Sequence, residues 1–194
     1  MSYAEKFLKA HGQTCTINRT PAATSKVSIK RSTRSSRDLG SREAYWEGLI
    51  LADALLLSGE VLTIGADKYL TQSVNTDYAS TEHAFFAAKC NAILQHKRET
   101  ETLDANNNPV KKWEDVNEDV PNVDAYGEIV TYQLRQFDPG LLEQTRYIFQ
   151  VPKSIGVLEL DRIVYNGDNY QVVSIDDIGM RGVDRVQLGV DLRP

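Results

Sequence analysis

The stretch "DRIVYNGDNYQVVSIDD", residues 161–177, decides our interpretation of the fold. It consists of a short apolar run, the dipeptide Asn166-Gly167 and a second apolar run that follows a tyrosine. Asn-Gly favours a two-residue turn in which both central residues have positive φ, and antiparallel strands flank such turns. The stretch therefore predicts a tight β-hairpin with Asn166 and Gly167 at its turn.

A second stretch, "GEVLTIGADKYLTQSVNTD" at residues 59–77, has the same pattern with Gly65 at its turn. Placing Gly65 on Gly167 gives an offset of 102 before the turn, and treating Ala66 as an inserted residue gives an offset of 101 after it. An insertion is tolerated best at a turn. The repeat predicts a mainly β chain of two tandem small β-barrels or sandwiches. The alternative is that any two hairpins of a β protein would align this well.

This repeat predicts how the chain is divided. Residues 1–98 would form a short N-terminal helix and a β-barrel with a basic loop at 30–42, and residues 126–194 would form the second β-barrel. Residues 99–125 between them are polar, with a triple asparagine, and this composition is typical of a linker. We therefore expect a polar, acidic linker there.

Two local patterns bear on the first half of the chain. Ser2 and Glu5 have the spacing of a capping box, which predicts a helix over 2–11. The stretch "TEHAFFAAKCNAILQHKRE" (81–99) is ambiguous, because its alanines suit a helix. We favour a strand, because the corresponding stretch of the second copy, "VDRVQLGVDL" (183–192), has an extended pattern.

Composition limits the classes of partner. The chain has 194 residues and a net charge of -5, which argues against a protein that mainly grips duplex phosphates. Its longest strongly apolar run, "ALLLSG" at 54–59, is far shorter than the roughly 20 residues of a membrane span. The start of the sequence lacks the apolar core of a signal peptide. We expect no membrane partner.

The sequence gives little support for a metal or cofactor site. The chain has two cysteines and three histidines without CxxC or HxxxH spacing, so we expect free thiols and no metal or cofactor. Asp176 and Asp177, with Asp184 and Asp191 nearby, could in principle bind a divalent cation. They lack the regular oxygen spacing of a calcium loop, and carboxylates at hairpin ends are the favoured interpretation.

Catalytic motifs are equally scarce. Neither GxGxxG, GxxxxGK[ST] nor GxSxG occurs. Cys90 with His83 or His96 could suggest a thiol nucleophile, but ordinary packing of a free cysteine is favoured. The sequence therefore predicts a protein that is not an enzyme, with no catalytic residues.

The predicted basic loop carries Arg31, Arg34, Arg37 and Arg42 among serines. One interpretation is a flexible arm that contacts DNA phosphates or an acidic partner without reading bases. The other is a solvated hairpin tip that protects an edge strand. No aromatic residue interleaves the arginines, so stacking on single strands is not expected.

The hairpin pattern of residues 59–77, followed by "AFFAAKCNAIL" at 84–94, resembles the small β-barrel proteins of the tailed-bacteriophage neck. These are the head-closure or stopper proteins and the head-tail joining proteins. The stretch 161–177 resembles the same module again. A single barrel is common in that group, so a second barrel and an acidic linker are departures from it.

The resemblance implies a non-catalytic virion protein, made in the cytoplasm of the host bacterium. It implies a homo-oligomeric ring around the DNA channel, which joins portal-side and tail-side virion proteins and makes at most non-specific contact with packaged double-stranded DNA. Two alternatives stay open. One is an SH3-like or OB-like module that binds nucleic acid or protein, and the other is a small hydrolase with a metal at Asp176 and Asp177.

Overall fold

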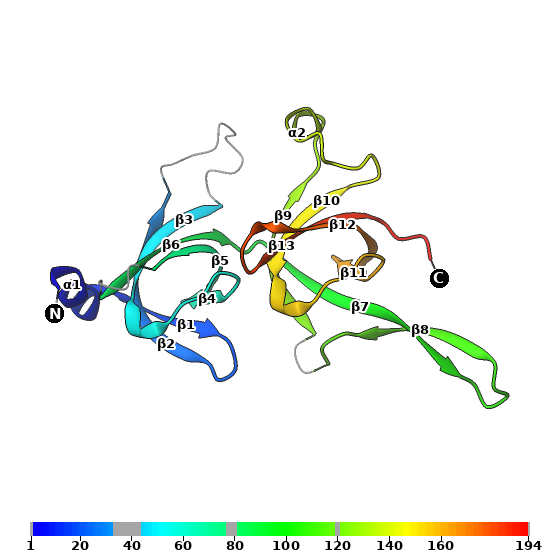
Figure 1. Ribbon diagram of the computed structural model, residues 1–194, viewed down its shortest axis with the longest axis horizontal. Helices are drawn as coiled ribbons and strands as arrows, with labels where there is room; N and C mark the ends of the chain where they lie inside the picture. The colour runs from blue at the N-terminus through cyan, green and yellow to red at the C-terminus, as the bar shows by residue number, and fades with distance from the viewer. Residues whose placement is uncertain (1, 33–43, 77–80, 119–120, 194) are drawn as a thin grey trace. The chain divides into compact units, whose positions relative to one another are not determined.

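The protein is described by a computed structural model that covers residues 2–32, 44–76, 81–118 and 121–193. The chain is mainly β and folds as two closed barrels of six strands in tandem (Figure 1). In chain order the elements are α1 (Tyr3–His11), β1 (Gln13–Asn18), β2 (Ala23–Arg31), β3 (Tyr45–Leu51), η2 (Ala52–Ala54), β4 (Val61–Ile64), β5 (Asp67–Asn75), β6 (Glu82–Lys89), β7 (Ala92–Leu103), β8 (Pro109–Asp115), β9 (Asn122–Ile129), α2 (Tyr132–Phe137), β10 (Tyr147–Pro152), η3 (Lys153–Ile155), β11 (Arg162–Tyr165), β12 (Asp168–Met180) and β13 (Val183–Val190).

The two barrels have the same strand order. The first barrel runs β1-β2-β3-β6-β5-β4 and is closed by pairing of β1 with β4. The second runs β7-β9-β10-β13-β12-β11 and is closed by pairing of β11 with β7, while β8 is appended to β7 outside this ring. The predicted duplication of a small β-barrel is confirmed, since each strand of the first barrel has a counterpart in the second.

The alignment of the two copies differs from the predicted one. Hairpins β4–β5 and β11–β12 each have a two-residue turn, so β4 and β11 already begin 101 residues apart, at Val61 and Arg162. The predicted insertion at Ala66 is wrong. Gly65 corresponds to Asn166, and both are left-handed, with φ of 62° and 52°. The predicted alignment matched Gly65 to Gly167 because both residues are glycine. In the structure Gly65 corresponds to Asn166, because these two residues share the left-handed backbone conformation.

The division of the chain also differs from the predicted one. The first compact unit comprises Met1–Asn91 with Asp177–Val183, and the second comprises Ala92–Asp176 with Asp184–Pro194. The first unit ends at residue 91, because β7 closes the second barrel. The tip of the β12–β13 hairpin is grouped with the first unit.

The predicted linker at 99–125 is wrong as well. Most of this segment is strand: it contains the end of β7, all of β8 and the start of β9. Its polar composition has a physical reason, because the β7–β8 ribbon has mostly exposed residues on both faces. Such a ribbon lacks the alternation of apolar and polar residues that marks a half-buried strand.

Two local predictions are confirmed. Helix α1 is capped by Ser2, whose Oγ accepts a hydrogen bond from the Glu5 backbone N–H at 3.0 Å. The ambiguous stretch 81–99 is extended, with β6 and the first part of β7 in place of a helix. The short helix α2 was not predicted.

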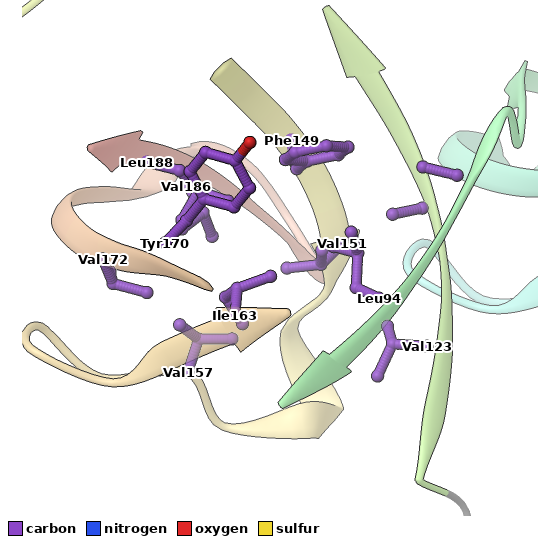
Figure 2. Packing of buried hydrophobic residues seen from close by; sticks show 12 residues of the cluster. Leu94, Val123, Phe149, Val151, Val157, Ile163, Tyr170, Val172, Val186 and Leu188 are labelled. Carbon is purple, nitrogen blue, oxygen red and sulfur yellow. The ribbon is translucent and has the colours of Figure 1, made fainter. Parts of the chain in front are cut away.

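Each barrel has its own apolar core. In the second barrel the buried side chains converge from β7, β9, β10, β11, β12 and β13, as Figure 2 shows. Its labelled members are Leu94, Val123, Phe149, Val151, Val157, Ile163, Tyr170, Val172, Val186 and Leu188. The first barrel has a corresponding cluster, in which Leu56, Leu62 and Tyr69 take the places of Val157, Ile163 and Tyr170. Equivalent positions of the two copies therefore fill the two interiors. Within the described residues, no helix has the length and apolar character needed to cross a membrane.

The core of the second barrel makes a prediction about Gly127 in β9. Gly127 pairs with Phe149, and a Cβ at this position would overlap the Phe149 ring. We expect Gly127→Ala to lower the free energy of unfolding by about 1–3 kcal/mol, as overpacking of a core does. Chemical denaturation measures this. The matched control is Gly140→Ala, where the nearest atom lies 3.3 Å away on the Asp138 side chain and little change is expected. Equal effects of the two substitutions would contradict the packing described.

Candidate functional site

The most distinctive feature of the second barrel is the two-stranded ribbon of residues 97–115, which we call the arm (Figure 1). β7 and β8 pair along it from Lys97↔Asp115 to Leu103↔Pro109. In the first barrel, β1 and β2, which correspond to β7 and β9, are joined by the short segment 19–22. Because β8 takes no part in barrel closure, the arm is an addition to the repeated module.

The surface of the arm carries ion pairs between its two strands. Lys111 Nζ lies 2.9 Å from Glu99 Oε1, and Lys97 Nζ lies 3.6 Å from Asp115 Oδ1. Such exposed pairs stabilise the ribbon little. Near the far end, Leu103 exposes 66% of its surface and the neighbouring Val110 is also exposed. The arm therefore presents a slightly acidic surface, with four basic and five acidic residues in 97–115, and has apolar residues near its tip.

The tip of the arm is a compact turn. The Asp104 carboxylate accepts hydrogen bonds from the backbone N–H groups of Asn106 and Asn108, at 2.7 and 2.8 Å. These bonds lower the pKa of Asp104. Asn107 lies between them with φ of 61°, a conformation that asparagine tolerates better than most residues. The asparagines thus build the turn.

The outer side of the arm's base is fixed by a tryptophan and two arginines. The Arg162 guanidinium lies 3.8 Å from the centre of the Trp113 ring, and that of Arg193 lies 4.7 Å away. Both arginines bind Asp191, with Arg162 Nε at 2.7 Å and Arg193 Nε at 2.8 Å. Burial alone would raise the pKa of Asp191, but the bonds from Arg193 and Arg162 outweigh it and lower the pKa to about 2. The arm's base is thereby joined to the strand-closing residue Arg162 and the segment after β13.

The inner side of the base carries a buried carboxylate. Asp161 accepts from Arg98 Nε at 2.8 Å, Arg98 Nη2 at 2.7 Å and the Leu158 N–H at 2.8 Å, and His96 Nε2 lies 2.7 Å from it. Burial would raise the pKa of Asp161, but the bonds from Arg98, His96 and Leu158 lower it far below its ordinary value. The bond to Asp161 in turn raises the pKa of Arg98. This group joins β7 to the turn before β11.

The first barrel repeats this contact in a simpler form. Arg19 Nη1 lies 3.1 Å from Glu60 Oε1, and Arg19 Nη2 donates to the Ala54 carbonyl at 2.8 Å. Glu60 also accepts from the Leu57 N–H at 2.8 Å, as Asp161 does from Leu158. Strand pairing places Ile17 where the second barrel has His96. The arginine–carboxylate contact is therefore a structural element of the module, and the copy with the arm adds a histidine to it.

The loop between β9 and β10 is a second candidate surface. It contains α2, and it occupies the place that the β2–β3 connection has in the first barrel. Arg135 fixes the loop by donating to the carbonyls of Leu142, Glu143 and Thr145 at 2.9, 3.0 and 2.6 Å. Tyr132 and Phe137 remain exposed at 76% and 77%. The sequence signal that could have found it is Thr131, whose hydroxyl caps the helix.

The predicted basic residues are only partly described. Arg31 is exposed at the end of β2, and Lys30, which precedes it, lies 3.3 Å from Glu47. Residues 30 and 31 belong to a strand and not to a loop. Arg34, Arg37 and Arg42 lie outside the described residues. The predicted contact of these four arginines with DNA or a partner stays a prediction.

The predicted turn residues lie where expected. Gly65, Asn166 and Gly167 all have positive φ, at 62°, 52° and 85°. A Cβ at Gly65 or Gly167 would meet no atom within 4 Å. The left-handed backbone, and not a close approach of neighbours, is therefore what favours glycine at these two turns.

Among the described residues, no group of three or more His, Cys, Asp or Glu side chains could bind a metal. Asp191 is one of the four carboxylates that the sequence offered for a divalent cation, and it forms ion pairs with Arg162 and Arg193 instead. Cys15 and Cys90 are free thiols. Burial raises the pKa of the Cys15 thiol, which makes it a poor nucleophile.

Comparisons with known proteins add little. No family model matches the chain. No curated protein matches it. Among solved structures, the chain is similar to the solution structure of protein SF1141 from Shigella flexneri 2a, with 12% identity and a TM-score of 0.43, over 54% of this chain and 96% of that one. We draw no conclusion from a likeness this low.

Equivalent substitutions in the two arginine–carboxylate contacts should lower the free energy of unfolding by different amounts. Asp161→Asn removes a charge that is 4% exposed and bonded to two side chains, and we expect a loss of roughly 3 kcal/mol in the free energy of unfolding. Glu60→Gln removes the more exposed counterpart, and we expect about 1 kcal/mol. Urea denaturation of both variants checks this. A larger loss for Glu60→Gln would contradict the assigned roles.

Asp161 also predicts a dependence of stability on pH. Its pKa is lowered from an ordinary value of 3.8, so its contribution is fully present above about pH 4 and is lost as pH falls toward the lower pKa of the folded state. The stability difference between wild type and Asp161→Asn should therefore be constant from pH 5 to about 7 and should shrink below about pH 4. Denaturation at several pH values measures it. If this stability difference grew as the pH falls, the pKa of Asp161 would not be lowered in the folded protein, and the prediction would be contradicted.

Proposed function

We propose that the chain is a structural protein of a tailed-phage virion, which forms a ring at the head-to-tail connector, joins the portal side to the tail and surrounds the DNA channel. The observation that carries this proposal is the arm. Closure of the second barrel does not need it, yet the arm is fixed at its base on both sides, by Trp113 outside and by Arg98 inside. A feature that is well fixed and serves no internal packing suits contact with another protein.

The resemblance of residues 59–77 and 161–177 to phage neck proteins supports the same class. Proteins of that kind act by presenting surfaces to copies of themselves and to adjoining rings. The arm and the α2 loop are two such surfaces, each with exposed apolar side chains on an ordered backbone. Exposed aromatic side chains such as Tyr132 and Phe137 are typical anchors of protein interfaces.

The charge of the chain suits this role. A net charge of -5 on each copy gives a ring an acidic balance. Duplex DNA that passes through such a ring is repelled overall, and this prevents tight phosphate contacts. Contact with the packaged DNA would be non-specific and limited to basic positions such as Arg31.

The proposal predicts self-association and a specific role for the arm. The purified chain should sediment as a closed oligomer, with rings in negative-stain images, and should join heads that contain portal protein to tails. Replacing 101–111 by Asn-Gly connects Thr100 to its strand partner Lys112 and removes the outer arm. This variant should keep the ring and lose the joining of heads to tails, because the base contacts remain.

Two outcomes would contradict the proposal. One is a chain that stays monomeric at every concentration and ignores heads and tails. The other is a monomer that binds duplex DNA with an affinity that falls steeply with salt, measured by fluorescence anisotropy. The second result would favour the SH3-like or OB-like nucleic-acid module instead.

A further inference from the structure

We propose that the arms of two copies of this chain pair with each other through the outer edge of β8, in one antiparallel register that is centred on Trp113. The two copies are related by a two-fold axis, and strands β7 and β8 of both form one four-stranded sheet. An isologous contact of this kind is complete after two copies. It therefore does not build the proposed ring and does not rest on it.

The outer edge of β8 is open for such a pairing. β8 is the last strand of its sheet, and among the described residues it pairs with β7 alone. Val116 N donates to His96 O at 3.0 Å, and Asp104 N donates to Asn108 O at 2.9 Å. Because hydrogen-bonded residues alternate along an antiparallel pair, the even-numbered residues of β8 bond to β7. The backbone groups of its odd-numbered residues therefore point away from β7.

The sequence along this edge is complementary to itself. Residues 110–116 read "VKKWEDV", so two lysines precede Trp113, two acidic residues follow it, and a valine stands at each end. In an antiparallel pair of identical strands, the first half of one strand lies opposite the second half of the other. Lysines on an edge strand usually prevent pairing. Here the same strand supplies the carboxylates that oppose them, which makes a second copy of this chain the fitting partner.

Only one register uses this complementarity. Outward-pointing residues must face each other, so one residue has to lie opposite its own copy at the two-fold axis. Any other residue of 111–115 at the axis would face its own like charge, which destabilises a strand pair. With Trp113 at the axis, Lys112 lies opposite the partner's Glu114, and Lys111 lies opposite the partner's Asp115. Charge therefore selects the register centred on Trp113.

The charges of β7 fit the same arrangement. Within one chain, Lys111 lies opposite Glu101, and Asp115 lies opposite Lys97. Across the four strands, one row would consist of Glu101, Lys111, the partner's Asp115 and the partner's Lys97, whose charges alternate in sign. The ion pairs of Lys111 with Glu99 and of Asp115 with Lys97 lie within one arm and can persist. Each charge then has an opposite charge on both sides.

Other charged groups near the edge do not oppose the contact. Two arginines lie over Trp113 and share one aspartate, which leaves a single positive charge on the face where the partner's Asp115 would lie. Beyond the paired strands, Glu118 would lie opposite Asn108, which is uncharged.

The second edge of the arm, on β7, suits such a contact less well. β11 already pairs with β7 at Lys97, so the edge is limited to 98–103. Because the even-numbered residues of this segment bond to β8, the charged residues among the outward ones are Glu99 and Glu101. Two such edges would set like charges against each other. The edge of β8 is therefore the one that fits a second copy.

Cysteines at the two valines test the register. Val110 and Val116 are 37% and 36% exposed, and each would lie opposite the other valine of the partner, with Cα atoms about 4.5 Å apart as in a pair without mutual hydrogen bonds. This separation suits a disulfide. On mild oxidation, Val110→Cys/Val116→Cys should form covalent dimers. Each single variant should not, because its two cysteines would lie about 20 Å apart.

Non-reducing electrophoresis measures the cross-linking. The wild type, with its free thiols Cys15 and Cys90, gives the background, and the Tm of each variant checks that the fold is intact. A double variant that cross-links no more than the single variants would overturn the inference. So would a ladder of larger species in place of dimers, because it would show a head-to-tail contact between arms.

An exchange of charges tests the complementarity. In the double-cysteine chain, Lys112→Glu or Glu114→Lys creates two like-charge pairs across the axis, and either should lower the rate of dimer formation about tenfold. The two substitutions together re-form opposite pairs and should restore the rate. The matched control is Lys6→Glu, an exposed position in α1, which should leave the rate unchanged. Single variants that cross-link as fast as their parent, or a combined variant that does not recover, would overturn the pairing.

Failure of this inference is distinct from failure of the proposed function. If the wild type forms rings and the cysteine variant gives no dimers, the ring stands and the edge of β8 is not a contact between copies. If dimers form and no ring is found, the edge contact stands and the proposed ring fails.

Discussion

Each half of this protein depends on one strand pairing that joins segments distant in sequence. In the first barrel Ile17 of β1 pairs with Leu62 of β4, and in the second His96 of β7 pairs with Ile163 of β11. Such pairings are costly to form, since a long loop must close first. Once made, they close the ring of six strands in each barrel and enclose the core. Any surface offered to a partner then has to come from additions to the barrel, such as the arm, or from its turns and loops.

The arginine–carboxylate contacts lie beside these closing pairs. Arg19 follows β1 and binds Glu60 before β4, while Arg98 continues β7 and binds Asp161 before β11. In the second barrel the acidic side chain is an aspartate and not the longer glutamate, it is more buried, and it is also bonded to His96. Buried charge contacts of this kind fix geometry because every alternative leaves a charge unpaired. The barrel that bears the arm therefore has the more extensive set of contacts beside its closing strand pair.

Sequence reasoning succeeded where apolar runs flank a tight turn and failed where a two-stranded ribbon is exposed on both faces. The hairpins at 59–77 and 161–177 were predicted because apolar runs flank their turns and the turns need positive φ. The arm was taken for a linker, because a ribbon exposed on both faces has the composition of a disordered segment. Trp113 was the available signal: a large aromatic residue in a polar stretch needs a partner, and Arg162 and Arg193 provide it. No local pattern could have placed those arginines, since they come from β11 and from the segment after β13.

The first turn, residues 52–60 between β3 and β4, differs from the second turn, residues 153–161 between β10 and β11, in a way that packing explains. Gly59 cannot be replaced, because a Cβ there would overlap the Gly182 carbonyl at the tip of the β12–β13 hairpin, which is grouped with the first unit. The first turn can thus have its second exposed leucine only at the other left-handed position, where Leu55 lies. The second turn has leucine at the position equivalent to Gly59, as Leu160, and glycine at the other, as Gly156. The two barrels therefore have leucine and glycine at opposite left-handed positions of the same turn, and the close approach of Gly182 to Gly59 explains why the first barrel has glycine at position 59.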